Sequence, residues 1–242
     1  MNKIAILILS NTKNRNWKTM EETYLYHTIL SLINTLCKNH HYKLYIGIDH
    51  DDELLISNEN NFSKIVYNIH NSSLQFVHYT DIKKGHVTKM WNILYDMAYH
   101  DGYEYFYQMG DDIKFLNDGW VTKSIENLKK NGDIGLTGPV IINGNTNILT
   151  QSFISRKHKE IFGHLFPEEI INWFCDDWIN KVYKKYDSGK YYIKMTEYKS
   201  SNNSFGNGGQ RYPVVNIHAT IDNIIDKSYQ VFIEYLNTKL SS

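Results

Sequence analysis

The sequence is poor in cysteine and has no net charge, and these two shortages narrow the classes of protein it can belong to. Two cysteines, Cys37 and Cys175, stand far apart without CxxC spacing among 242 residues, a pattern typical of reduced thiols in a cytosolic setting. Lysine plus arginine equal aspartate plus glutamate at 26 each, so no overall field draws the chain to nucleic acid or to an anionic membrane. An anionic ligand must therefore be held by a local site.

Long apolar runs are also missing. No segment approaches the roughly 20 apolar residues that a membrane span needs. The run at 4–9 is too short for a signal peptide, lacks a small-residue cleavage site and passes directly into the polar residues 10–14, so it is interpreted as a buried strand. We therefore expect a soluble, cytoplasmic protein. The many Asn, Ile, Lys and Tyr residues indicate an organism or virus with an AT-rich genome.

The first half of the chain alternates strand-like and helix-like patterns. This alternation predicts an α/β fold with a central, mostly parallel sheet flanked by helices. Three of the strands end in polar loops, at 10–14, 49–52 and 110–112. In a parallel sheet such loops share one edge, where open α/β sheets bind ligands. The expected strands are 3–9, 42–48, 74–79 and 103–109, and the expected helices are about 20–38 and 86–99.

The second half is less regular, but no repeat or low-complexity linker interrupts it. A single compact domain is therefore expected. Glycine and serine at 200–209 predict a mobile loop, because these residues retain conformational freedom. Helices are predicted at 120–129, 176–186 and 221–240, one or two strands at 134–149, and a further strand at 213–218.

Two adjacent carboxylates, Asp111 and Asp112, follow the aromatic strand at 103–109. Neighbouring Asp side chains repel each other and are poorly tolerated beside a buried strand without a counter-charge. Oxygen ligands at the carboxyl end of a strand suit Mg²⁺ or Mn²⁺, which keep open positions for the phosphates of a nucleotide. The pair therefore predicts a divalent metal site. The alternative is that it only ends a strand and begins a turn.

Two further patterns have both a functional and a structural interpretation. Lys89 and Asn92 follow Gly85 on the first turns of a predicted helix, where backbone amides make a seat for a ribose or a phosphate; the alternative is a solvated helix face. A second acidic pair, Asp176 and Asp177, precedes another predicted helix. Its structural interpretation is helix capping.

In this order, the motifs resemble those of the GT-A glycosyltransferases, particularly the inverting family 2. The resemblance implies a GT-A, Rossmann-like fold, with a nucleotide-binding half at about 1–112 and an acceptor-binding half at about 113–242. It implies that the loops after the first two strands hold the nucleotide base and that a loop at 206–211 closes over the diphosphate. The donor-binding residues implied are Thr12, Asn14, Asp49, Lys89, Asn92, Asp111 and Arg211.

The resemblance also assigns the metal and the catalytic groups. Gly110-Asp111-Asp112 is similar to the DXD-type motif, with glycine in place of the first aspartate, so Asp112 is expected to bind Mn²⁺ or Mg²⁺ with help from Asp111. His218 is the candidate third ligand, although a lone histidine is more often structural. The second acidic pair looks like the family's Glu-Asp-Trp region. This makes Asp177 the catalytic base, Asp176 its acceptor-binding neighbour, and Trp120, Trp173 and Trp178 acceptor-binding or core residues.

The sequence thus predicts a metal-dependent, inverting glycosyltransferase. It would move a sugar from a nucleoside-diphosphate donor, with a UDP-sugar favoured, to a glycan or another hydroxyl acceptor. A sugar-phosphate nucleotidyltransferase is one alternative, but residues 10–16 lack the glycine that such enzymes place after the first strand. A non-catalytic carbohydrate-binding protein is the other, and it has no need of two acidic pairs.

Overall fold

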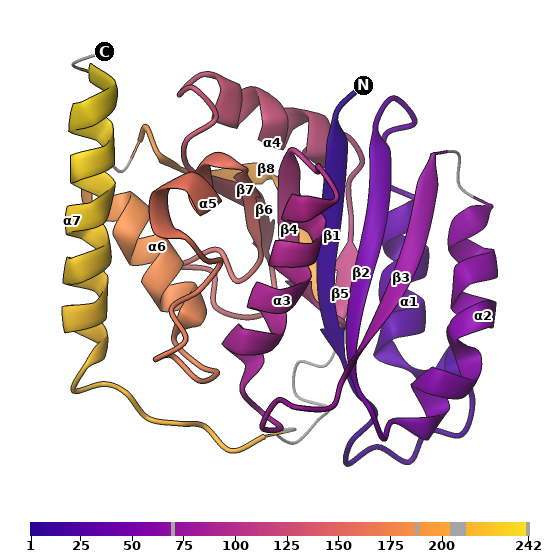
Figure 1. Ribbon diagram of the computed structural model, residues 1–242. Coiled ribbons are helices and arrows are strands. Elements are labelled where there is room, and N and C mark those ends of the chain that lie inside the picture. The colour runs from indigo at the N-terminus through magenta and orange to yellow at the C-terminus, as the bar shows by residue number, and fades with distance from the viewer. Residues whose placement is uncertain (69–70, 187–188, 204–211, 241–242) are drawn as a thin grey trace.

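The computed structural model describes residues 1–68, 71–186, 189–203 and 212–240. Within these ranges, eight strands form one sheet in the order β3-β2-β1-β4-β7-β6-β8-β5. Helices cover both faces of this sheet (Figure 1). The α/β fold with a mostly parallel sheet flanked by helices is therefore confirmed.

Four parallel strands make up one half of the sheet. β1 lies between β2 and β4, and β2 lies between β1 and β3. Their carboxyl ends therefore meet along one edge, the lower edge in Figure 1, which we call the carboxyl edge. The bounds are Lys3–Ser10 for β1, His41–Asp49 for β2, Ser72–Tyr79 for β3 and Tyr105–Gly110 for β4.

Helices connect these parallel strands. In α1, buried Leu25, Ile29 and Leu32 recur at helical spacing and face the sheet, as an amphipathic helix requires. The helix α2 was not expected from the sequence. The connecting elements are the 3-10 turn η1 (Met20–Glu22), α1 (Tyr24–Ile33), α2 (Glu53–Tyr67) and α3 (Val87–His100).

The second half of the sheet is mixed. β7 runs antiparallel between β4 and β6, whereas β8 is parallel to β6 and antiparallel to β5. The strands are β5 (Ile113–Phe115), β6 (Leu136–Ile141), β7 (Ser152–Ser155) and β8 (Tyr192–Asn202), and the helices are α4 (Trp120–Lys129), α5 (Lys157–Phe162), α6 (Cys175–Tyr186) and α7 (Ile221–Leu240).

Two sequence predictions in this half are wrong. Residues 213–217 form no strand; together with Tyr212 they form an extended segment, which we call the strap, that crosses beneath the sheet at the carboxyl edge before α7 (Figure 1). Residues 200–202 are not part of a loop, because they belong to β8 and pair with β5. The rest of the predicted mobile loop, residues 204–209, lies outside the described residues.

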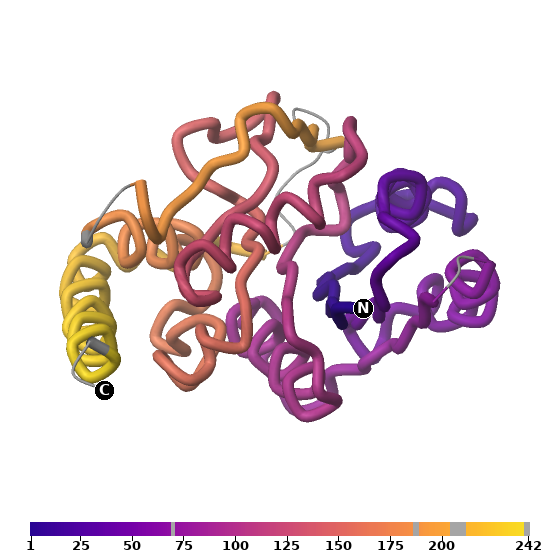
Figure 2. The backbone as a smooth tube through the Cα atoms, turned by 90° about the horizontal axis from the view of Figure 1, so that it is seen from above, coloured from indigo at the N-terminus to yellow at the C-terminus, as the bar shows by residue number. Residues whose placement is uncertain are grey.

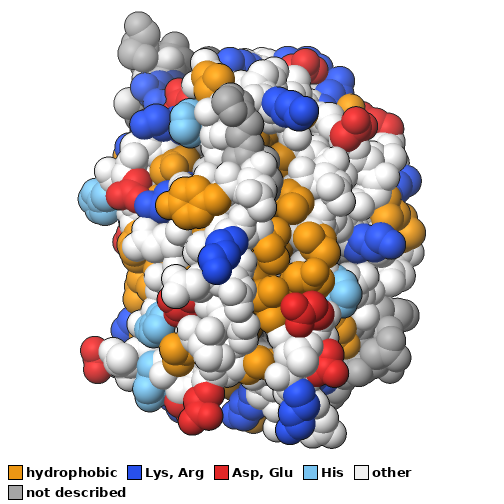
Figure 3. Space-filling model, turned by 90° about the vertical axis from the view of Figure 1, so that its right-hand side faces the viewer, with side chains coloured by type: hydrophobic (Ala, Val, Ile, Leu, Met, Phe, Trp, Pro, Cys, Tyr) orange, Lys and Arg blue, Asp and Glu red, His pale blue; other side chains and the backbone are white. Residues whose placement is uncertain are grey.

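Each face of the sheet has its own hydrophobic core. One contains buried residues of α3, α5, α6 and α7, and the other contains those of α1, α2 and α4. Figure 2 shows α7 at the margin of the molecule, far from α2. In Figure 3, basic and acidic side chains are mixed over the face that presents β3 and α2. None of the described helices is both long and apolar enough to cross a bilayer.

Candidate functional site

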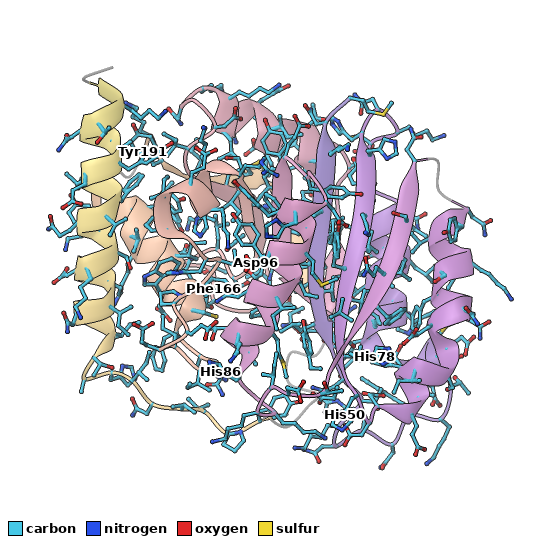
Figure 4. The ribbon with its side chains drawn as sticks, in the orientation of Figure 1. His50, His78, His86, Asp96, Phe166 and Tyr191 are labelled. Carbon is cyan, nitrogen blue, oxygen red and sulfur yellow. The ribbon has the colours of Figure 1, made fainter. Side chains whose placement is uncertain are left out.

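The carboxyl edge gathers most of the residues predicted to act on a substrate. Figure 4 shows His50 and His86 along this edge, the first directly after β2 and the second directly before α3. The loop after β1 and the turn after β4 end beside them, because all four strands run the same way. The position agrees with the general rule that open parallel sheets bind ligands at their carboxyl ends.

The first carboxylate after β4 is fixed from two sides. Asp111 is only 2% exposed, and its Oδ2 accepts a hydrogen bond of 2.6 Å from the Ser10 hydroxyl at the end of β1. The Thr28 hydroxyl of α1 donates to the Asp111 carbonyl oxygen, also at 2.6 Å. Asp111 therefore anchors the turn and faces the interior of the protein.

Asp112 is the more accessible carboxylate of the pair, because its side chain is only partly buried. The backbone amide of Asn203 donates to its carbonyl oxygen at 2.6 Å. A Cβ atom added at Gly110 would lie 2.8 Å from Asp112 Oδ1, which is closer than Cβ atoms approach other atoms. The carboxylate of Asp112 thus lies over residue 110, and glycine there, the departure from a DXD motif, makes room for it.

These donors suit a divalent ion that is shared with a substrate. Mg²⁺ is commonly held by one or two carboxylates together with the phosphate oxygens of a nucleotide, and Asp112 offers one accessible carboxylate. Across the described residues, no three His, Cys, Asp or Glu side chains gather as a metal-binding group. His218 does not join Asp111 and Asp112 in such a group. It is exposed, and its ring lies 4.6 Å from that of Phe174, centroid to centroid.

The loops after β1 and β2 are tied to each other. Asp52 accepts hydrogen bonds from the Thr12 amide at 2.6 Å and the Thr12 hydroxyl at 2.9 Å. The same carboxylate caps α2 through the amide of Leu55. Asn14 is exposed and has a left-handed φ of 60°. The structure thus brings Thr12 and Asn14 to the carboxyl edge, and Thr12 is engaged with a neighbouring loop.

Asp49, at the end of β2, lies in a polar cluster with the strap. Its carboxylate accepts a hydrogen bond from the hydroxyl of Tyr212, and the side-chain amide of Asn11 donates to that hydroxyl at 3.0 Å. Both Asp49 and Asn11 are more than nine-tenths buried. This cluster joins the ends of β1 and β2 to a segment that lies far along the chain.

The structure gives Asn92 a different role from the predicted one. Its side chain is buried, donates to the carbonyl of Phe166 at 2.8 Å and accepts from the amides of Leu165 and Phe166 at 3.1 and 2.9 Å. These bonds tie α3 to the loop after α5 and leave little capacity for a nucleotide. Lys89 is half-buried on the first turn of α3, near the edge.

The second acidic pair begins α6 at the same edge. Asp176 Oδ1 accepts a hydrogen bond of 3.0 Å from the backbone amide of Asp177, so the pair does contribute to the helix start. Burial raises the pKa of Asp176 to about 6, and the neighbouring charge of Asp177 adds to the shift. At neutral pH a fraction of the protein therefore keeps a proton on Asp176.

Two of the three tryptophans predicted at the acceptor pack in the core instead. Trp120 and Trp178 are fully buried; the first stacks on Phe115, and the second lies against Phe162. Neither presents a face to a sugar ring. Trp173 is 55% exposed and lies just before the acidic pair, so it keeps the position that an acceptor-stacking residue needs.

Asn172 connects the acidic pair to the strap. Its amide nitrogen donates to the carbonyls of Pro213 at 2.9 Å and Gly85 at 3.4 Å. Its carbonyl oxygen accepts from the amides of Trp173 at 2.7 Å and Val215 at 3.1 Å. One buried side chain thus joins the loop before α3, the loop before α6 and the strap.

Some site residues could not be foreseen, and others cannot be placed. Arg211, and the loop at 206–211 expected to close over a diphosphate, lie outside the described residues. Asn11 follows the first strand as Asp49 ends the second, a parallel that could have drawn attention to it. Tyr212 gave no local signal, because its partners Asn11 and Asp49 lie 201 and 163 positions away.

Comparison with solved structures identifies the class of fold. The neighbours are glycosyltransferases of GT-A type, and the protein shares this fold. Among them are three crystal structures of S. aureus TarS, with TM-scores of 0.50, 0.51 and 0.53 and sequence identities of 15, 14 and 13%. The last of these contains UDP.

The likeness extends over most of this protein but only part of each neighbour. It covers 83, 97 and 95% of the chain, which spans 58, 40 and 64% of the respective TarS structures. No protein-family model matches the sequence, and no curated protein is similar to it. At this level of identity, the comparison establishes the fold alone.

Proposed function

We propose that the protein is a metal-dependent glycosyltransferase that moves a sugar, with inversion, from a UDP-sugar to a hydroxyl acceptor. One observation supports this most directly: hydrogen bonds between adjoining residues of three segments connect the neighbourhoods of the two acidic pairs along the carboxyl edge. Ser10 binds Asp111, the next residue, Asn11, binds Tyr212 of the strap, and the strap binds Asn172 just before the second pair. The fold shared with TarS, which binds UDP in one structure, gives further support.

The first pair would serve the leaving group. Mn²⁺ or Mg²⁺ would supply positive charge against the diphosphate as the glycosidic bond breaks. Asp112 would hold the ion, and Asp111 would keep the turn in place through its bonds to Ser10 and α1. Lys89, on the first turn of α3, would add a positive charge beside the backbone amides of the helix start.

The second pair would serve the acceptor. Inversion needs a base that takes the hydroxyl proton on the side opposite the leaving diphosphate. Asp177 would be this base. Asp176, whose pKa is raised to about 6, would bind the hydroxyl beside it. Trp173, exposed next to the pair, would stack on the acceptor sugar.

A screen of donors tests the proposal. Release of nucleoside diphosphate is measured for UDP-, GDP-, ADP- and CDP-sugars with Mn²⁺, Mg²⁺ or EDTA. We expect release from a UDP-sugar with metal and little with EDTA. Pyrophosphate release from UTP and a sugar phosphate would instead indicate a nucleotidyltransferase, and no turnover with any donor would contradict the proposed activity.

Asp177→Asn tests the assignment of the base. We expect the rate of transfer to fall by about 10² to 10⁴, the contribution of a positioned general base, while the affinity for UDP measured by calorimetry stays within about twofold of the wild type. Glu126→Gln is the matched control, because Glu126 lies on α4 with a side chain that is 57% exposed. Loss of UDP affinity with transfer retained would contradict the assignment.

A further inference from the structure

We propose that the strap fills a nucleobase slot with the chain's own Tyr212, so that a uridine nucleotide binds by displacing this side chain. The inference rests on the proposed function and concerns the side chain that occupies the place of the donor's base before the nucleotide binds. It follows from what surrounds the Tyr212 ring on three sides: a polar end, a flat backbone face and a cation.

The polar end of the slot is built from two buried side chains. The hydroxyl of Tyr212 donates to Asp49 and accepts from the Asn11 amide at 3.0 Å. A carboxylate acceptor next to an amide donor is complementary to an N–H next to a C=O on one edge of a flat ring. The imide edge of uracil carries both groups. The hydroxyl of tyrosine takes their place, because it donates a hydrogen bond and accepts one at the same oxygen atom.

The faces of the slot fit a planar ring. Gly85, with a left-handed φ of 86°, lies against the ring, and a Cβ atom added there would come within 3.0 to 3.1 Å of Tyr212 carbon atoms. Any other residue at position 85 would intrude on the slot. The ammonium of Lys13 lies 5.0 Å from the ring centroid, at a distance that allows a cation–π contact.

The slot also lies at the right distance from the proposed metal ligand. β2, which ends at Asp49, is separated by β1 from β4, which ends just before Asp112. Strands are spaced about 4.8 Å apart, so two spacings amount to about 10 Å. A ribose and a diphosphate bridge a gap of this order. A nucleotide whose diphosphate faces Asp112 therefore places its base at the end of β2, where Tyr212 now lies.

Asn172 holds the strap in this position. It binds the backbone on both sides of Val214, through the Pro213 carbonyl and the Val215 amide. The next residue, Trp173, is three positions before Asp176. Displacement of Tyr212 by a base would thus strain contacts beside the proposed acceptor site, so that donor binding would shift the loop before α6, the helix whose first turn carries Asp176 and Asp177.

Tyr212→Phe tests the competition, because it removes the hydroxyl and keeps the ring. The free variant leaves Asp49 and Asn11 without this partner, an unfavourable state for buried polar groups, and UDP restores their hydrogen bonds. We expect the variant to bind UDP with Mn²⁺ about tenfold more tightly than the wild type. Tyr235→Phe is the control, because the Tyr235 hydroxyl of α7 donates to Glu160 of α5, away from the slot, and this variant should bind UDP as the wild type does.

Hydrogen exchange at the Val215 amide gives a second readout. If UDP displaces Tyr212, exchange at Val215 should become faster when UDP is added to the wild type, and it should already be fast in Tyr212→Phe. Equal or weaker UDP binding by the variant, or slower exchange at Val215 with UDP bound, overturns the inference while leaving the proposed function intact. Absence of UDP binding in both proteins overturns the proposed function and this inference together.

Discussion

Gly110 illustrates how a single residue sets the geometry of the site. Glycine has no side chain to oppose the carboxylate of Asp112, which lies over it. The departure from an Asp at this position was visible in the sequence, but its reason was not. The contact depends on the turn geometry of residues 110–112, and the sequence shows only that three small or acidic residues follow one another.

Gly110→Ala should therefore weaken metal-dependent nucleotide binding while leaving the fold intact. The added methyl group displaces the Asp112 carboxylate, so we expect UDP affinity with Mn²⁺ to fall by roughly tenfold and the free energy of unfolding to change by less than about 1 kcal/mol. Calorimetry and urea denaturation measure the two quantities. Gly144→Ala, where the new Cβ meets Ile141 at an ordinary 3.4 Å, is the control. Unchanged affinity would show that Asp112 does not hold the ion.

Asp176 gives the protein a characteristic pH dependence of stability. Its pKa in the folded protein is about 6, above its ordinary value of 3.8, so the folded state binds more protons than the unfolded state between these values. Buried His158, whose pKa is lowered to about 3, makes the stability of any variant that keeps it rise with pH over this range, so the contribution of Asp176 is the difference between the wild type and Asp176→Asn. This difference should turn against the wild type as pH rises from about 4 to 6 and then level off. Asp176→Asn should therefore match the wild type more closely near pH 4 and be more stable than the wild type at pH 7 by roughly 1 to 3 kcal/mol. Urea denaturation from pH 4 to 8 checks this, and parallel curves for the two proteins would contradict it.

Single residues were predictable where their chemistry is local. The acidic pairs stood out because adjacent carboxylates are unusual beside buried elements, and both pairs lie at the carboxyl edge. The roles of Asn92, Trp120 and Trp178 were not predictable, because burial depends on which segments pack over a residue. Asn92 became a structural link only because the loop at 165–166 folds against it.

At the scale of elements, helices were predicted correctly where apolar residues recur at clear helical spacing. α4 and α7 have the bounds expected from the sequence. α2 was missed because its middle is rich in Ser and Asn, residues that favour caps and turns, and its buried residues are only Leu55, Phe62 and Val66. The predicted strand at 213–218 failed because Val215 gives its amide to the Asn172 side chain rather than to a neighbouring strand.

The hydrogen bonds that Asn92 makes between α3 and the loop after α5 should stabilise the folded protein. Asn92→Ala leaves the Phe166 carbonyl and the amides of Leu165 and Phe166 without this buried partner, and each such group costs about 1 to 3 kcal/mol. We expect a loss of roughly 3 kcal/mol in the free energy of unfolding, with UDP affinity of the folded variant unchanged. Chemical denaturation measures the free energy of unfolding, and calorimetry measures the UDP affinity. Normal stability with weakened UDP binding would restore the donor-binding role first predicted.

For the whole molecule, the parallel half was predictable and the mixed half was not. Alternating strands and helices in the first hundred residues allow few arrangements other than parallel βα units. The insertion of β7 antiparallel between β4 and β6 is a choice among several compatible pairings. The sequence of the short segment 152–155 does not indicate which strands it pairs with.

Metal and nucleotide should stabilise the whole protein together rather than separately. Asp112 offers one accessible carboxylate, so Mn²⁺ alone should bind weakly, and UDP should raise the affinity for Mn²⁺ by the same factor as Mn²⁺ raises that for UDP. We expect a small rise in melting temperature with either ligand and a larger rise with both, equivalent to about 2.7 kcal/mol at a hundredfold excess over Kd. Additive shifts would mean that the two sites are independent.

The pairing of α6 with α7 offers a way to adjust catalysis from a distance. The indole of Trp178 donates to the Ser228 hydroxyl at 3.0 Å, and Lys185 forms an ion pair with Asp226. The first turn of α6 carries Asp176 and Asp177, so substitutions along this helical seam would reorient the pair without touching it. Libraries that vary the α7 side of the seam would therefore be a practical starting point for changing acceptor preference or heat tolerance.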